Sequence, residues 1–233
     1  MTYFESRLPV NFERINDLQN RLRLCEKIGI KNIILEPQND LRNISLDLKK
    51  EIESFVKINI FYRINLKIDT LDDFKSKIKN YNKFAGILSV ESLNKEVQLR
   101  SAKDSRVDII SFSDPEILKS LTPGIVSLTK QNNSFIEFSL APIMESNKVL
   151  QSKNFRNLYK YIHLVLKLKA NFLISGNFQN LFNYRHPRAL ISVCHTLLGI
   201  PLVLAKKAFS INPELLIEKV QKSQNNIFNF KIN

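Results

Sequence analysis

Residues 107–112 read Val-Asp-Ile-Ile-Ser-Phe, and residues 134–140 read Ser-Phe-Ile-Glu-Phe-Ser-Leu. Both stretches are short and rich in β-branched and aromatic residues, which is typical of strands buried on both faces of a parallel sheet. A helical stretch, Pro123–Gln131, lies between them. Strand, helix and strand in this order predict a right-handed parallel crossover.

The same alternation extends over the rest of the chain, and successive strand-like stretches are mostly ~20–30 residues apart, the length of a strand–helix unit. The other expected strands are Tyr3–Leu8, Asn32–Glu36, Ile58–Ile68, Phe84–Ser89 and Asn171–Ser175. The other expected helices are Phe12–Ile28, Leu46–Val56, Leu71–Tyr81, Leu93–Lys103, Glu116–Leu121, Ser152–Lys169, Pro187–Leu198, Leu202–Phe209 and Pro213–Ser223.

Seven strands with intervening helices predict an α/β fold, a distorted TIM-like barrel of about seven parallel strands, because repetition of one crossover brings the ends of the sheet together. An open doubly wound sheet is the alternative. No linker rich in Pro, Gly or Ser divides the chain. We therefore expect one barrel domain over residues 1–223 and a polar C-terminal tail over residues 224–233 that frays.

Several protein classes are disfavoured by the sequence. The longest apolar runs are much shorter than the ~18 residues that a membrane span needs, and the first residues do not read as a signal peptide. The two cysteines, Cys25 and Cys194, are 169 residues apart in helix-like apolar contexts, which indicates buried reduced thiols. We expect a cytoplasmic protein with no membrane partner.

The charge of the chain is strongly basic, with 35 Lys and Arg against 22 Asp and Glu, a net charge of +13. The acids are unevenly placed, since the 68 residues between Glu145 and Glu214 contain none. A segment without acids indicates a surface for an anionic partner, although a lysine-rich genome composition could also raise the basic content. The ten cations in this segment are Lys148, Lys153, Arg156, Lys160, Lys167, Lys169, Arg185, Arg188, Lys206 and Lys207.

The expected helix over residues 152–169 separates its residues into two faces. At 100° per residue, Phe155, Leu158, Ile162, Val165 and Leu166 share one side and predict packing on the sheet. Four cations lie on the opposite side within an arc of about 60°. A stripe of cations along a helix can follow a phosphate backbone. We therefore predict RNA contacts for Lys153, Arg156, Lys160 and Lys167.

Two further candidates for anion contact follow the last strand. Backbone N–H groups at Ser175 and Gly176 could meet an anion, although a Ser-Gly pair is more often a turn. Arg185 and Arg188 flank Pro187, which suits the first turn of a helix, so a helix dipole would add to these two guanidinium groups. The charges predict phosphate contacts for Arg185 and Arg188, whereas the Ser175-Gly176 pair on its own leaves the question open.

The sequence gives no positive case for catalysis by the chain itself. Its three histidines form no His-x-His pair, and it has no glycine-rich phosphate loop and no Gly-x-Ser-x-Gly motif. Carboxylates near strand ends (Glu5, Glu36, Glu91 and Glu137) could hold Mg²⁺ or Mn²⁺, or could be structural acids, paired to Arg63 or capping helices. We predict no catalytic residue and no metal ligand. A metal-dependent phosphoesterase and a basic protein–protein adaptor remain alternatives.

Several motifs together resemble ribonuclease P protein component 3. Residues 107–112 and 136–140 are similar to two strand signatures of this family. The closing motifs follow the family's order and approximate spacing: Ile174-Ser175-Gly176, Arg185-His186-Pro187, Leu198-Gly199-Ile200, Ala205, Ala208-Phe209-Ser210 and Asn212-Pro213. The chain departs from the family at Glu5, where an Asp is usual, and at Asn177, where an Ala is usual.

The resemblance implies a barrel related to the polymerase-and-histidinol-phosphatase superfamily, from a branch without the metal-binding histidines. It implies assembly with ribonuclease P RNA, precursor tRNA and a second protein, component 2, in an archaeal-type ribonucleoprotein. Where the family pattern matches, it also implies RNA contacts at Ser175, Gly176 and Arg185. The complex would be the enzyme, an endonuclease that removes the 5′ leader of precursor tRNA. The chain would bind no cofactor, and the RNA would hold the Mg²⁺.

Overall fold

The structure is a computed structural model that describes residues 2–38, 44–81, 84 and 86–229, with side chains described to residue 223. All seven predicted strands are present in these ranges, with bounds shifted by up to three residues. The strands are β1 (Phe4–Val10), β2 (Asn32–Pro37), β3 (Asn59–Lys67), β4 (Ile87–Glu91), β5 (Ile109–Phe112), β6 (Phe135–Ser139) and β7 (Phe172–Ser175).

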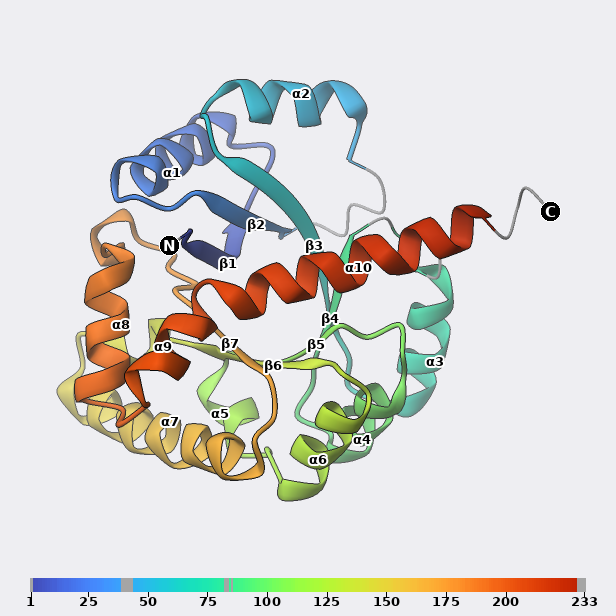
Figure 1. The fold of residues 1–233 in the computed structure, drawn as a ribbon, viewed down its shortest axis with the longest axis vertical. Coiled ribbons are helices and arrows are strands. Elements are labelled where there is room, and N and C mark those ends of the chain that lie inside the picture. Colours follow the sequence, from blue (N-terminus) through green and yellow to red (C-terminus); the bar gives the residue numbers. More distant parts are fainter. Residues whose placement is uncertain (1, 39–43, 82–83, 85, 230–233) are drawn as a thin grey trace.

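The strands form one parallel sheet in the order β1 to β7, so every neighbour in space is also the next strand in the chain. The sheet curls until β7 lies beside β1, and helices surround it (Figure 1). The distorted TIM-like barrel is therefore confirmed over the open-sheet alternative. β1 has an irregular register between Glu5 and Leu8, and such a bulge bends a strand and turns its side chains.

The helices lie mostly where the sequence predicts them. They are α1 (Ile15–Lys27), α2 (Leu46–Ser54), α3 (Leu71–Asn80), α4 (Lys95–Lys103), α5 (Pro115–Leu118), α6 (Pro123–Gln131), α7 (Lys148–Leu168), α8 (Pro187–Thr196), α9 (Leu202–Ala208) and α10 (Ile211–Asn229), with short 3₁₀ turns η1 (Ala141–Met144) and η2 (Leu181–Asn183).

Capping explains several helix starts. The hydroxyl of Thr70 accepts a hydrogen bond from the backbone N–H of Asp73 at 3.2 Å and caps the start of α3. Ser92 does not cap the next helix. Its hydroxyl accepts from the N–H of Asn94, and Asn94 is the residue that caps α4.

The start of α10 also differs from expectation. The helix begins at Ile211, so Asn212 is not its N-cap. The Asn212 side chain instead donates a 2.8 Å hydrogen bond to the carbonyl of Phe172 and holds α10 against β7. The helix continues to Asn229, so the first six residues of the predicted tail are helical, and residues 230–233 lie outside the described ranges.

The barrel interior is built in layers, because side chains alternate between the two faces of each strand. Near the start of the strands the inward side chains are apolar, and α10 lies across this end of the barrel (Figure 1). Leu216, Ile217 and Val220 of α10 pack on that layer, which contains Phe4, Ile34, Ile87, Ile109, Phe135 and Leu173. The outward residues form the larger core beneath the surrounding helices.

Above the apolar layer, the inward positions become polar. The next inward residue on β3, β4, β5 and β6 is Arg63, Ser89, Ser111 and Glu137, respectively, and all four are fully buried.

Among the helices that the structure describes, none combines the length and the apolar character that a membrane span requires.

Candidate functional site

Arg63 lies in the middle of the barrel and is fully buried. Its guanidinium makes a two-point ion pair with Glu137, at 2.7 Å and 2.9 Å to the two carboxylate oxygens. It also donates to the Ser89 hydroxyl at 2.9 Å and to the carbonyl of Ser6 at 3.2 Å. The Nε atom lies 3.1 Å from a carboxylate oxygen of Glu36. A buried charge needs partners of this kind, because its own hydration is lost on folding.

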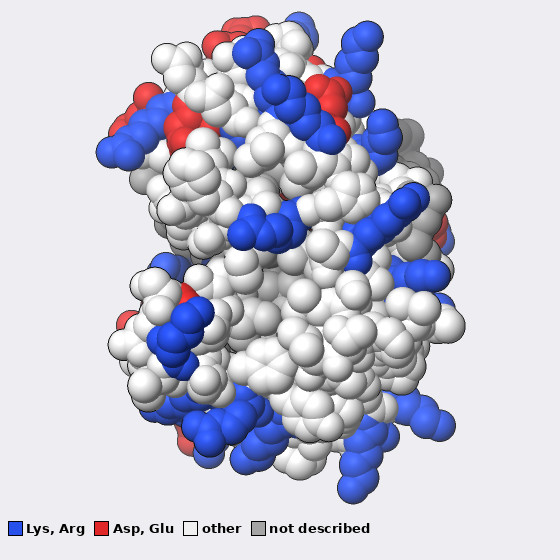
Figure 2. Space-filling view, turned by 90° about the vertical axis from the view of Figure 1, so that its left-hand side faces the viewer, with Lys and Arg blue, Asp and Glu red and all other residues white. Residues whose placement is uncertain are grey.

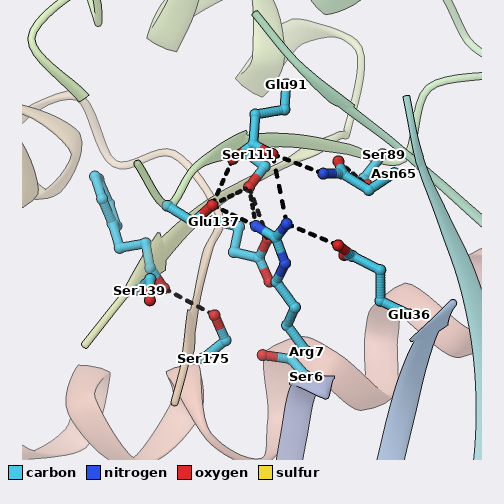
Figure 3. Close-up of polar contacts among 12 residues, drawn as sticks. Ser6, Arg7, Glu36, Asn65, Ser89, Glu91, Ser111, Glu137, Ser139 and Ser175 are labelled. Atoms are coloured by element: carbon cyan, nitrogen blue, oxygen red, sulfur yellow. Dashed lines mark hydrogen bonds and ion pairs between the residues drawn. The ribbon is translucent and has the colours of Figure 1, made fainter. Parts of the chain in front are cut away.

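Arg7 lies nearer the barrel mouth and forms a second centre of positive charge (Figure 3). It donates to Glu36 at 2.8 Å, lies 3.4 Å from Glu91, and donates to the hydroxyls of Ser111 and Ser113. Burial opposes the charged form, but Glu36, Glu137 and Glu91 outweigh it and raise the pKa of Arg7. Arg7 therefore stays positively charged at every pH at which the protein is folded.

Glu91 completes this network at the mouth. It accepts hydrogen bonds from the Asn65 amide at 2.7 Å and from the Ser113 hydroxyl at 2.5 Å. Burial would raise the pKa of Glu91, but the charge of Arg7 and these hydrogen bonds together lower it. Two guanidinium groups and three carboxylates thus fill the polar layer, and each carboxylate has an arginine partner.

The donor set does not fit a divalent metal. Arg7 and Arg63 stand among the carboxylates that would have to bind the ion, and they already satisfy those carboxylates. Across the described residues, no group of three His, Cys, Asp or Glu side chains is arranged to hold a metal ion. The pairing of a strand-end acid with Arg63, which the sequence suggested, is confirmed by the contact between Arg63 and Glu137.

The fourth strand-end acid, Glu5, has a different environment at the junction of β1 and β7. Its carboxylate accepts hydrogen bonds from the backbone N–H groups of Gly176, at 3.0 and 3.2 Å, and of Arg7, at 3.2 Å. Burial, opposed by these hydrogen bonds and assisted by the charge of Glu137, raises the pKa of Glu5 to about 7. The backbone N–H at the end of β7, which the sequence offered to an external anion, is therefore bound by the carboxylate of Glu5.

This arrangement determines where two predicted RNA contacts lie. Ser175 is fully buried, and its hydroxyl donates to the carbonyl of Phe138 at 3.3 Å. Gly176 is buried as well, and its N–H is bound by Glu5. RNA contact by this pair stays a prediction, and it would require these internal hydrogen bonds to open.

The predicted cationic face of α7 is present in the structure. Leu158, Ile162 and Val165 are buried against the barrel, as the periodicity predicts, while Phe155 and Leu166 are partly buried. The four cations on the opposite side are all exposed: Lys153, Arg156, Lys160 and Lys167. The helix begins earlier than expected, at Lys148, because the Asn147 side chain caps it by accepting from the N–H groups of Val149 and Leu150.

Arg185 and Arg188 lie at the start of α8 and are exposed. Pro187 is the first helical residue, as predicted, and the His186 ring accepts a 3.1 Å hydrogen bond from the N–H of Arg188. Arg185 bends back and donates to the carbonyls of Phe182 and Tyr184 at 2.5 Å and 2.8 Å. Arg188 thus presents its charge at the positive end of the helix dipole.

These cations are not neutralised by acids from elsewhere in the fold. In the part of the chain that the structure describes, none of the ten cations between Glu145 and Glu214 takes part in an ion pair within 4 Å. Figure 2 shows Lys and Arg side chains along the lower part of one face, where acidic side chains are few. The acid-free sequence segment therefore folds into an exposed positive surface.

The histidines and cysteines have structural surroundings. Ring nitrogens of His163 and His195 bind the carbonyls of Leu198 and Ile200, at 3.0 Å and 2.9 Å. Cys25 and Cys194 are free thiols and fully buried. Burial raises the pKa of Cys194 to about 12, so this thiol stays protonated at neutral pH.

A cavity of about 780 Å³ opens at the barrel mouth, above the Arg7 network. Its wall combines Arg7, Glu36 and Glu91 with Lys67 at the end of β3, Lys77 of α3, and Asp69, Asp114 and Gln179 from loops that follow the strands. Charges of both signs share this wall, so the cavity has no single electrostatic preference.

Arg7 was not identified from the sequence, nor were the serines that bind the two arginines, Ser111 and Ser113 at Arg7 and Ser89 at Arg63. The signal was present in the alternation, since Ser89, Ser111 and Glu137 each stand two residues after an inward apolar residue of their own strand. Arg7 was harder to find, because the bulge in β1 interrupts that alternation.

The fold and its interior define a TIM-like barrel protein with an arginine–glutamate network inside and a separate cationic surface. A sequence model of the family described as RNase P subunit p30 matches residues 3–225. The chain belongs to this family. It is therefore a subunit of ribonuclease P with a role in the processing of tRNA 5′ ends.

Solved structures share the fold at low sequence identity. A chain in the cryo-EM structure of archaeal ribonuclease P with mature tRNA aligns with a TM-score of 0.74 and 16% identity, over 94% of this chain and 91% of that one. A mutant of an organophosphorus hydrolase from Deinococcus radiodurans aligns with a TM-score of 0.57 and 9% identity, over 92% of both chains. A search of curated proteins gave no significant match.

Proposed function

We propose that this chain is an RNA-binding scaffold of ribonuclease P and performs no bond cleavage itself. The observation that carries the proposal is the exposed, unpaired set of cations on α7 and at the start of α8. When RNA binds to such charges, no ion pair within the protein has to be broken. The phosphates replace only water and mobile ions.

The second part of the proposal concerns catalysis. The polar layer of the barrel, where a barrel hydrolase places its ligands, holds Arg7 and Arg63 instead. Metal-assisted hydrolysis of the leader would use Mg²⁺ held by the RNA. The chain would bind no cofactor, and it would act by favouring the active fold of the RNA and lowering the Mg²⁺ that this fold requires.

The family and the likeness to a ribonuclease P complex support a hetero-oligomer as the working form. We propose ribonuclease P RNA, precursor tRNA and component 2 as partners, and an archaeal-type cytoplasmic complex as the setting. The two free, buried thiols suit a reducing compartment.

Reconstitution tests the proposal. The cognate RNA is combined with the full chain, with and without component 2, and cleavage of precursor tRNA is measured across a Mg²⁺ series. We expect no cleavage by the chain alone and faster cleavage at low Mg²⁺ when the chain joins the RNA and component 2. Cleavage of precursor tRNA or of a model phosphodiester by the chain alone, with Mn²⁺ or Mg²⁺, would contradict the scaffold role and favour a phosphoesterase. Full activity of RNA with component 2 alone would also contradict it.

A further inference from the structure

Two aromatic side chains on α7 form a stacked pair beside the cationic face. Tyr159 and His163 are one helical turn apart, and their ring centroids are 4.2 Å from each other with 31° between the planes. Tyr159 is nevertheless 44% exposed. One face of the tyrosine ring is covered by His163, and the residue still offers a large part of its surface to solvent.

The neighbouring chain holds this pair in place. Nε2 of His163 lies 3.0 Å from the carbonyl of Leu198, and because a carbonyl can only accept, this nitrogen donates. Gly199, with a φ of +66°, follows directly. A Cβ at Gly199 would lie 3.1 Å from His163 Nε2 and 3.4 Å from Tyr159 Cε2. The glycine therefore lets the loop approach both rings closely and limits their movement.

The core does not require the tyrosine. The fully buried residues of α7 are Leu158, Ile162 and Val165, and on a helical projection Tyr159 stands between this apolar side and the cationic arc, about 60° from Ile162. The apolar surface of an exposed aromatic ring is poorly hydrated. Such a ring is also an efficient contact surface, because only two side-chain torsions have to be fixed when a ligand binds.

The electrostatic setting selects the kind of ligand. Arg156 lies one turn before Tyr159, and Lys160 follows it directly, and both side chains are exposed. On a helical projection the tyrosine borders the cationic arc of α7 at about 60° from Arg156. The segment from 146 to 213 contains no acid. An aromatic face beside unneutralised cations matches a nucleotide, whose base stacks while its phosphate is neutralised.

We propose that Tyr159, supported by His163, is a stacking platform for an unpaired nucleobase of RNA whose flanking phosphates lie along the cations of α7. The inference rests on the proposed RNA-binding role and adds to it a preference for a single-stranded segment. A duplex keeps its bases stacked on each other and has no free base face to offer, so only the cations of α7 would contact it.

The test uses the full chain, Tyr159→Ala and Tyr159→Phe. The probes are a single-stranded oligoadenylate with one 2-aminopurine, and the same strand paired with oligouridylate. Dissociation constants are measured over a salt series, and 2-aminopurine fluorescence reports stacking. Loss of a base–aromatic stack predicts roughly 5- to 150-fold weaker single-strand binding by Tyr159→Ala, with an unchanged salt slope. Tyr159→Phe should bind like the parent, and duplex binding should be the same for all three proteins.

Single-strand binding by Tyr159→Ala equal to that of the parent overturns the platform, as does an equal loss for both probes. The two proposals fail differently. If the parent binds neither probe nor the cognate RNA, the scaffold role fails and the platform with it. If alanine at the α7 cations reduces the salt slope while Tyr159→Ala changes nothing, only the platform fails. A Tyr159→Ala variant that releases component 2 and keeps its RNA affinity assigns the ring to a protein contact and also overturns the proposal.

Discussion

Arg63 on β3 and Glu137 on β6 meet inside the barrel through two parallel contacts of 2.7 Å and 2.9 Å, and neither side chain is exposed to solvent. This pair ties together two strands that are not neighbours in the sheet. Its partners extend the connection to β1 through the carbonyl of Ser6, to β2 through Glu36 and to β4 through Ser89. The polar layer thus spans the barrel.

Removing one half of this pair should be costly. Glu137→Gln removes the two-point partner of Arg63 and leaves it only Glu36, which Arg7 shares, so we expect a loss of ~3–5 kcal/mol in the free energy of unfolding, measured with urea. The double substitution Arg63→Met with Glu137→Leu should cost less than the single one, because no charge remains unpaired. Glu116→Gln, at an exposed ion pair with Lys119, is the control and should have no measurable effect. A harmless Glu137→Gln would show that Glu137 is not needed to hold Arg63.

Glu5 should make stability depend on pH near neutrality. Its pKa is about 7 in the folded chain against 4.5 as the ordinary value, so the folded state keeps a proton that the unfolded state has released. Stability from this group is complete below about pH 4.5 and is lost as the pH rises through 7. Glu5→Gln should remove a pH-dependent loss on the order of 3 kcal/mol between pH 4.5 and 8.

The measurement for Glu5 is urea unfolding of the parent and of Glu5→Gln across that pH range. Glu91 and Asp108 also titrate with shifted pKa values, so the informative quantity is the difference between the two proteins at each pH. Parallel stability curves for the two proteins would exclude Glu5 as the titrating group.

Gly176 should tolerate no side chain. A Cβ there would lie 2.6 Å from a carboxylate oxygen of Glu5 and 2.8 Å from the ring of Phe178, which is buried. Gly176→Ala should therefore lower the stability by about 1–3 kcal/mol, seen as a lower Tm. Gly124→Ala in α6 is the matched control, since its nearest neighbour would be 3.8 Å away, and it should change little or stabilise by up to about 1 kcal/mol. Equal Tm values for the two variants would contradict the close packing at the end of β7.

The salt dependence of RNA binding should locate the cationic surface. If six cations contact phosphates, the slope of log K against log salt should be about −4 to −5. Alanine at all six should flatten the slope and weaken binding without unfolding the chain: Lys153, Arg156, Lys160, Lys167, Arg185 and Arg188. The control changes six exposed cations of α2, α3, α4 and the α2–β3 loop: Lys50, Lys57, Lys79, Lys95, Arg100 and Lys103. The choice of surface would be refuted if the control substitutions flattened the salt slope and weakened RNA binding more than the six substitutions on α7 and α8.

Most of the fold could be predicted from the sequence, because strands buried on both faces leave short stretches rich in β-branched and aromatic residues, as in Val107–Phe112, and capped amphipathic stretches lie between them. The place of α10 could not. Its apolar residues indicate a buried side, but nothing local tells whether that side packs on the outside of the sheet or across the end of the barrel. Asn212 shows the same limit, since its hydrogen bond to Phe172 joins residues 40 positions apart.

The candidate site was predictable in part. The exposure of the α7 cations follows from helical geometry alone, and it is confirmed. The burial of Ser175 and Gly176 could not be foreseen, because the anion that meets the Gly176 N–H comes from Glu5, at the other end of the chain. Arg7 was missed for a related reason, since its partners stand on β2, β4 and β5 and are brought together only by closure of the barrel.

The position of α10 has a consequence for biosynthesis. The apolar layer at the start of the strands contains Phe4, Ile34, Ile109, Phe135 and Leu173, and it is covered by α10, which follows all seven strands in the sequence. While the ribosome still holds that helix, this apolar layer of the nascent barrel is exposed to water, which favours aggregation. Folding of this barrel can therefore be completed only after α10 has left the ribosome.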